Sequence, residues 1–186
     1  MNLYLRLAWT LLRCLFLPAI SPTDTLVVRR RVWINDIDIN LHMNNGRYLT
    51  VVDLSLIEFF ARTGIFRAAI KQKWRPMAGG STITFRKGLT PFQSYELRFR
   101  WICSAGPWNY MSYEFVRANR IHAAGILKGG MVGKRGLIDS DDAMQFMPKQ
   151  LQDAAKTRLN SPAPAEVIAW QQSEGGLYAT ASERIS

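Results

Sequence analysis

Asp36-Ile37-Asp38-Ile39-Asn40-Leu41-His42-Met43-Asn44-Asn45-Gly46-Arg47-Tyr48 is a run that alternates polar and apolar side chains and leads directly into a long apolar segment. Asn44 or Asn45 can cap a helix here, because an asparagine side chain accepts a hydrogen bond from the unpaired N–H groups of a first helical turn. Gly64 ends this helix, and Glu58 can pair with Arg62 at four-residue spacing near its C-terminus. The helix must be buried, since apolar residues cover nearly every face of it: Tyr48, Leu49, Val51, Val52, Leu54, Leu56, Ile57, Phe59 and Phe60.

Strand patterns lie on both sides of this helix. Residues 26–34 read as one strand before it, and strand signals follow it at residues 77–87, 94–104, 108–117 and 121–138. We expect the basic stretch of residues 65–75 between them to be irregular. Alternation along the second of the later strands predicts a sheet with one face in water, the apolar set being Tyr95, Leu97, Phe99 and Trp101. An antiparallel sheet curved around the helix satisfies this order, so we predict an α+β fold.

Residues 1–20 form a strongly apolar segment that Arg6 and Arg13 interrupt. Neither uninterrupted stretch reaches the length that a membrane-spanning helix needs, and Arg13 breaks the apolar middle that a secretory signal requires. Arg6, Thr10 and Arg13 share one side at helical spacing, as in an amphipathic helix at the inner surface of a membrane. Packing of the helix on the protein's own dimer explains the pattern equally well, so both alternatives stay open.

Length and composition fit one globular domain with short additions. With 48% hydrophobic residues in a chain of 186, a sizeable core can be buried. We predict an N-terminal helix in residues 1–20, the main domain in residues 26–140, and a C-terminal helical extension and tail in residues 141–186. The extension should hold a helix at residues 141–159 and a short segment around residues 165–178. A formal charge of +10 indicates an anionic partner without identifying it.

Metal and disulfide chemistry have little support in the sequence. Cys14 and Cys103 are the only cysteines, so we expect two reduced thiols in a cytoplasmic protein. His42 and His122 are the only histidines, and without a Cys/His cluster we predict no metal site. Strand alternation explains the basic and aromatic residues around Arg98, so we expect no nucleic-acid partner.

The pattern Asp36-x-Asp38-x-Asn40-x-His42-Met43-Asn44-Asn45-x-x-Tyr48 resembles a motif of the plant acyl-carrier-protein thioesterases. It is also similar to the Asp-x-Asp segment of the 4-hydroxybenzoyl-CoA thioesterases, and in both groups this segment precedes a buried helix. Over nearly its full length, the chain looks most like the thioesterase-like group that includes animal thioesterase superfamily member 6. The resemblance implies the hotdog fold and a homodimer or larger assembly with the site between subunits. It also implies an acyl-CoA or acyl-carrier-protein substrate in lipid metabolism, with coenzyme A as part of the substrate and no other cofactor.

Hydrolysis of a thioester needs a group that activates water and a fixed dipole that stabilises the oxyanion. Asp38 lies just before the helix and can act as general base, or attack the carbonyl directly to give an anhydride. The N–H groups of Asn45 or Gly46 can stabilise the oxyanion, because a helix N-terminus carries unpaired donors and a partial positive charge. By resemblance to the plant enzymes, Asn40 would orient the reacting groups and His42 would polarise the substrate or transfer protons.

Structural roles compete with the catalytic ones. Asp36, Asp38, Asn40 and Asn44 can bond the backbone of an irregular turn, and we expect Asp36 to do so. His42 can equally be a buried structural histidine.

Other carboxylates bear on the assignment as well. Asp53 and Glu58, both in the helix, are competing candidates for the catalytic carboxylate. Asp53 is the better candidate of the two, because it lies amid apolar residues. The plant enzymes add an acidic residue on a later strand, whereas no Asp or Glu occurs here between Glu58 and Glu96. The sequence therefore also allows a catalytically silent acyl-binding or membrane-associated scaffold protein.

Overall fold

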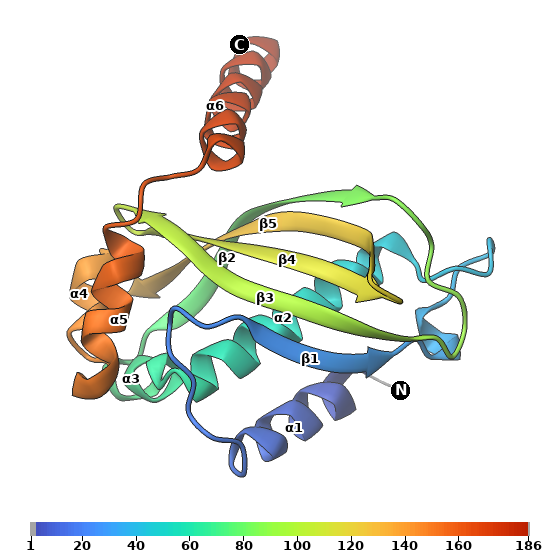
Figure 1. Cartoon of the computed structure of the whole chain (residues 1–186). Coiled ribbons are helices and arrows are strands. Elements are labelled where there is room, and N and C mark those ends of the chain that lie inside the picture. The colour runs from blue at the N-terminus through green and yellow to red at the C-terminus, as the bar shows by residue number, and fades with distance from the viewer. Residues whose placement is uncertain (1–2, 186) are drawn as a thin grey trace.

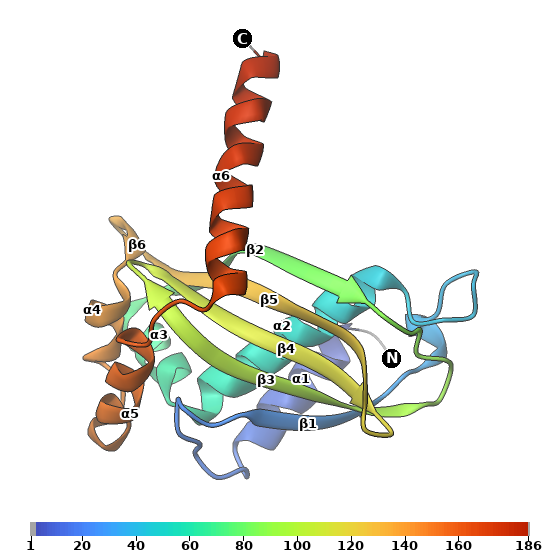
Figure 2. The same ribbon diagram turned by 45° about the horizontal axis from the view of Figure 1, so that its top comes forward.

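One antiparallel sheet organises the molecule, which a computed structural model describes over residues 3–185, with side chains to residue 177. Within this part of the chain the spatial order is β1-β3-β4-β5-β2 (Figure 1), and β6 extends the sheet beside the end of β5 (Figure 2). β1 and β2 are therefore edge strands. The strand bounds are β1 Leu26–Arg31, β2 Arg75–Phe85, β3 Ser94–Ala105, β4 Trp108–Arg117, β5 Arg120–Gly133 and β6 Gly136–Ile138.

Helix α2 (Asn45–Arg62) lies along the concave face of this sheet, and the core forms between them (Figure 1). The ring of Phe59 packs edge-on against Phe99 of β3 at 5.7 Å between centroids, and Tyr48 packs against Phe115 of β4 at 4.7 Å. The alternating apolar residues predicted to face inward on β3 are all buried: Tyr95, Leu97, Phe99 and Trp101. The predicted architecture, a curved sheet around a central helix, is thereby confirmed.

The sheet leaves one stripe of α2 uncovered. Asn45, Leu49 and Asp53 are exposed, and Asp53 is so although Val52 and Leu54 on either side of it are buried. The stripe lies toward edge strand β2, since the ring of Tyr48 also contacts Phe85 at 5.1 Å. The prediction of a helix covered all round is therefore correct only in part, because a sheet that ends at β2 cannot reach this side.

Helix α1 (Leu3–Cys14) packs against α2 with its polar side inward. Its buried residues are Arg6 and Thr10, and Arg6 donates a 2.7 Å hydrogen bond to the Asp36 carboxylate. Its exposed apolar side chains, with those that follow it, include Leu5, Trp9, Leu12, Leu15 and Phe16. Within residues 3–185, no helix combines the length and the apolar composition that crossing a membrane would require.

Two predicted segments differ from the structure. Residues 65–75 are not irregular, because α3 (Ile65–Gln72) occupies most of them and restarts the helical path after Gly64, whose φ is +81°. The single helix predicted at residues 141–159 is two helices, α4 (Ser140–Met144) and α5 (Lys149–Leu159). Pro148 separates them, since a proline inside a helix would lose a backbone hydrogen bond and clash with the preceding turn.

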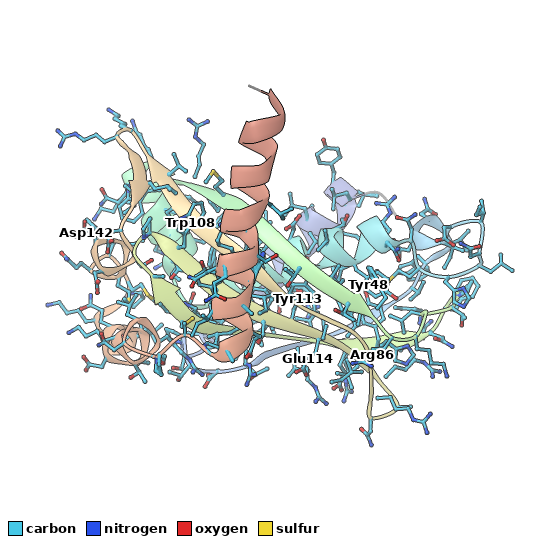
Figure 3. The ribbon with its side chains drawn as sticks, turned by 90° about the horizontal axis from the view of Figure 1, so that it is seen from above. Tyr48, Arg86, Trp108, Tyr113, Glu114 and Asp142 are labelled. Carbon is cyan, nitrogen blue, oxygen red and sulfur yellow. The ribbon has the colours of Figure 1, made fainter. Side chains whose placement is uncertain are left out.

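Helix α6 (Ala165–Ile185) stands out from the convex face of the sheet, and it is longer than the predicted segment (Figure 2). Its base is anchored where Lys128 of β5 pairs with Glu174 and lies 4.8 Å from the ring centre of Trp108. Trp170 packs edge-on against Tyr110 at 6.0 Å. Tyr48 and Trp108 lie toward opposite ends of the sheet, so α6 is anchored away from the start of α2 (Figure 3).

A glycine in β2 makes room for this anchor, which gives a first prediction. A Cβ atom on Gly80 would stand 3.1 Å from the Trp170 ring, so Gly80→Val should loosen α6 by about 1–2 kcal/mol through overpacking. Amide hydrogen exchange along α6 measures this loss. Gly175→Ala is the control, because a Cβ there meets nothing within 4 Å and should slow exchange by favouring the helix. Unchanged exchange in Gly80→Val would show that Trp170 does not hold α6.

Candidate active site

The motif segment, residues 36–48, forms a tight loop that runs into α2. Asn44 N–H donates to the Asp36 carbonyl at 2.7 Å, and Asp38 N–H donates to the His42 carbonyl at 3.0 Å. Leu41 closes the turn at the left-handed φ of +58°. Buried Met43 ties the loop to the body through a 2.7 Å bond from its N–H to the Leu89 carbonyl. The loop is thus a fixed hairpin whose tip carries Asp38, Asn40 and His42.

Asp38 is half-buried at the start of this turn. Its Oδ1 accepts a 2.8 Å hydrogen bond from the Asn40 N–H, which leaves its second carboxylate oxygen without a hydrogen-bond partner among residues 3–185. The Asn40 side chain is exposed, so Asn40 acts on Asp38 through its backbone. A carboxylate held at one oxygen and open at the other can accept a proton from water or attack an electrophile.

The start of α2 supplies the other predicted groups. The Asn44 side chain accepts a 2.9 Å bond from Gly46 N–H, which confirms the predicted cap, while Arg47 N–H donates to the Asn44 carbonyl at 2.8 Å. The Asn45 N–H has no partner in the described part of the chain. Of the two predicted oxyanion donors, Asn45 is therefore the one that is available, whereas Gly46 is engaged by the cap.

His42 is exposed, and its ring packs against Gly88 in the loop after β2. A Cβ atom added to Gly88 would stand 2.3 Å from the imidazole, so only a glycine at that position lets the ring lie there. The structure thus brings Asp38, Asn40, His42, Asn45 and Gly46 to one end of α2.

The competing carboxylates have different surroundings. Glu58 is buried and pairs with Arg62 at 3.5 Å, as the sequence spacing predicted. Asp53 lies on the uncovered stripe of α2, about 12 Å along the helix from Asn45. Although Asp53 is exposed at its surface, the buried residues packed around it partly desolvate its carboxyl and so raise its pKa. Burial and, to a lesser degree, the charge of Asp53 raise the pKa of Tyr113, whose hydroxyl donates to the Thr82 carbonyl at 2.9 Å.

The raised pKa of Asp53 gives a second prediction. A carboxyl whose folded pKa is raised contributes stability at pH values below its unfolded pKa, and this contribution is lost as the pH rises through the folded pKa. Asp53→Asn should therefore raise the free energy of unfolding at neutral pH, with the gain disappearing in acid, where the wild-type carboxyl is protonated. Urea denaturation at a series of pH values tests this, and a gain that persists in acid would mean that charge is not its cause.

Sequence reasoning missed one contact at the motif segment. Asp36 makes the turn contact that we expected, accepting the Trp33 N–H at 3.0 Å, but it also holds Arg6 of α1. The sequence did contain a feature that predicts this contact. Arg6 belongs to the polar side of its helix, and a charged side chain needs a partner when that side is buried. This ion pair connects α1 to the first residue of the motif.

The comparison with protein families decides what kind of protein has this architecture. A family model for the thioesterase-like superfamily matches residues 32–171, which include the motif segment and the whole sheet after β1. The chain belongs to the thioesterase-like superfamily. The superfamily assignment confirms the resemblance found in the sequence. It also confirms the predicted enzyme class, which is that of the thioester hydrolases.

Named relatives of the superfamily agree in sequence. The chain is 30% identical to Protein THEM6 of Danio rerio over 155 residues, which cover 81% of this chain and 74% of that protein. It is 29% identical to Protein THEM6 of Xenopus laevis over 137 residues, covering 73% of this chain and 62% of that protein.

Solved structures agree in fold. The BH1999 gentisyl-coenzyme A thioesterase aligns with a TM-score of 0.59 and 16% identity, covering 64% of this chain and 99% of the other. The probable thioesterase YbaW of Escherichia coli aligns with a TM-score of 0.60 and 11% identity, covering 73% and 99%. At these identities the likeness carries the fold alone, and it confirms the hotdog fold.

Proposed function

We propose that this protein hydrolyses an acyl thioester of coenzyme A or of an acyl carrier protein, with Asp38 as general base or nucleophile. The observation that carries the proposal is that one segment leading into α2 holds both an open carboxylate oxygen, on Asp38, and an unpartnered N–H, on Asn45. These two groups are the minimum that thioester hydrolysis requires: one to activate water or attack the carbonyl, and one to stabilise the oxyanion.

The proposed reaction proceeds in two steps. As general base, Asp38 takes a proton from water while the water oxygen bonds to the thioester carbon, and the carbonyl oxygen becomes an oxyanion facing the Asn45 N–H. The oxyanion then collapses, the carbon–sulfur bond breaks, and the thiolate leaves with a proton. His42 is in the motif segment and exposed, where it can transfer the proton taken up by Asp38 to the thiolate, and Asn40 keeps Asp38 in place through its backbone.

A second subunit would complete this site. Edge strand β2 leaves one side of its backbone unpaired, and Met77 and Phe85 on it are 39% and 40% exposed. The uncovered stripe of α2 lies along the same edge, and Ile39 and Leu41 at the loop tip are 97% and 70% exposed. Pairing of β2 with its copy in a homodimer would extend the sheet and cover these apolar groups together.

The test is release of free thiol from a panel of short, long and aromatic acyl-CoAs by the purified protein and by Asp38→Ala. We expect turnover of at least one thioester by the wild type and its loss in the variant. Asp53→Asn is the matched control, since it removes a carboxylate from the same helix region and should retain turnover. Equal rates in wild type and Asp38→Ala would rule out the assignment.

A non-catalytic acyl-binding protein is the second candidate, and one observation favours it. The later acidic residue of the plant enzymes has no counterpart between Glu58 and Glu96. Saturable binding of acyl-CoA with no thiol release across the panel would support this candidate over hydrolysis.

A further inference from the structure

An open groove separates α1 from edge strand β1 and the adjoining ends of β3 and β4. It has a volume of about 770 Å³, and the arginines that line it are Arg6, Arg13, Arg29, Arg30, Arg31 and Arg117. Glu96 is the carboxylate that lines it. We call this cavity the arginine groove. It is separate from the proposed catalytic loop, which it approaches only through the Arg6–Asp36 pair.

The positive charge of the arginine groove is largely uncompensated. Arg6 pairs with Asp36, and Arg29 pairs with Glu96 at 3.4 Å. The other four arginines have no carboxylate within 4.0 Å among residues 3–185. Repulsion between cations gathered in one cavity costs folding free energy, so their arrangement indicates an anion that is bound from outside.

Arg30 gives this indication a definite position. Its Nε and Nη2 atoms are buried and have no hydrogen-bond partner in the described part of the chain, and the same is true of Nε of Arg6. A buried guanidinium nitrogen without an acceptor is costly, whereas a phosphate oxygen forms short, charge-assisted bonds with it. The charges of Arg6 and Arg13 act on Arg30 from α1, so an anion seated there would face both walls of the groove.

The surface around the groove indicates which kind of phosphate-bearing ligand fits it. Trp9 and Trp33 line the groove and are 58% and 42% exposed. Beyond Trp9, the outward side of α1 and the residues after it are apolar and exposed, with Leu5 at 62%, Leu15 at 77% and Phe16 at 82%. Arginines beside tryptophan and an open apolar helix face match a lipid surface, where phosphates lie next to acyl chains. A second copy docked by this same face fits poorly, because it would bring its own groove arginines against these.

We propose that the arginine groove binds the phosphate of an acidic phospholipid, while the apolar side of α1 enters the membrane surface. The helix lies in the plane of the membrane, and the groove beneath it takes the headgroup. This binding does not depend on the hydrolysis proposed above, because it uses neither Asp38 nor the start of α2.

Co-sedimentation of the full chain with vesicles tests the proposal. We expect binding to vesicles of phosphatidylcholine mixed with phosphatidylglycerol, and little binding to phosphatidylcholine alone. Arg30→Gln should weaken binding about fivefold, which corresponds to about 1 kcal/mol for a basic residue at the surface. Arg117→Gln, at the end of β4, should have a similar effect and serves if Arg30→Gln does not fold. Leu5→Ser should weaken binding through the apolar side.

Arg135→Gln is the charge-matched control, since Arg135 is exposed in the turn between β5 and β6 and does not line the groove. Its binding should equal that of the wild type. Equal losses in Arg135→Gln and Arg30→Gln would overturn the proposal in favour of unspecific attraction. Binding of free coenzyme A that Arg30→Gln weakens, without any vesicle binding, would assign the groove to a soluble phosphate. Self-association that Leu5→Ser abolishes, again without vesicle binding, would assign the apolar side to a second copy.

Discussion

Asp38→Asn is expected to lower the rate of thiol release by a factor of about 100 to 10,000, the range that general acid–base catalysis supplies. Asparagine preserves the shape of the side chain and the acceptor for the Asn40 N–H, so the turn should keep its geometry. What is lost is the oxygen that can take a proton from water or attack the carbonyl. Steady-state kinetics on the best acyl-CoA of the panel measures the change.

Heavy-oxygen water separates the two roles of Asp38. If Asp38 attacks the carbonyl, a single turnover places heavy oxygen on the Asp38 carboxylate when water opens the anhydride there; if Asp38 is a base, only the released acid carries it. The control remains Asp53→Asn, which we expect to stay within a few-fold of wild type. A rate for Asp38→Asn equal to wild type, or a larger loss in Asp53→Asn, would move the catalytic role to Asp53.

Asp36→Asn should lower the free energy of unfolding by about 3 kcal/mol, the cost of leaving a buried charge without its partner. Arg6 and Asp36 side chains are only 8% and 3% exposed, so water cannot replace the lost interaction. Asparagine can still accept the Trp33 N–H, which confines the change to the charge. Urea denaturation followed by circular dichroism provides the measurement.

Two controls define what this loss means. The double variant Arg6→Met with Asp36→Asn removes both charges and should recover most of the loss, since no buried charge is then left without its partner. Asp153→Asn removes an exposed carboxylate, 96% accessible, and should change stability by less than about 0.5 kcal/mol. If Asp36→Asn behaves like Asp153→Asn, then the ion pair does not hold α1.

The sequence was sufficient for the central fold because its strongest signals are local. The motif segment precedes an apolar helix, and the alternation from Tyr95 to Trp101 identifies the inner face of β3. Helix α3 escaped prediction because it spans only about two turns and follows a glycine that also suits a helix end. For α6 the prediction was too short, because the segment was expected around residues 165–178 while the helix continues to Ile185.

The candidate site was also predictable from the sequence in part only. Asp38, Asn40, His42, Asn45 and Gly46 lie within nine positions, so chain connectivity alone brings them close together. Their availability depends on contacts that a pattern does not reveal: the cap engages Gly46, and Gly88 makes room for the His42 ring. The arginine groove could not be foreseen either, because it needs α1 and β1, which are remote from β4 in sequence, to meet around one cavity.

Because α1 turns its polar side inward and its apolar side outward, it stabilises the fold but lowers the solubility of the protein. A chain shortened to begin after residue 20 would lose the exposed apolar residues, and it should be easier to keep in solution. It would also lose Arg6, the ion-pair partner of Asp36, and it would expose the partly buried Arg30 of β1 to water. Removing this helix therefore yields a protein that is more soluble but less stable. Detergent is the better remedy for poor solubility when the intact molecule is required.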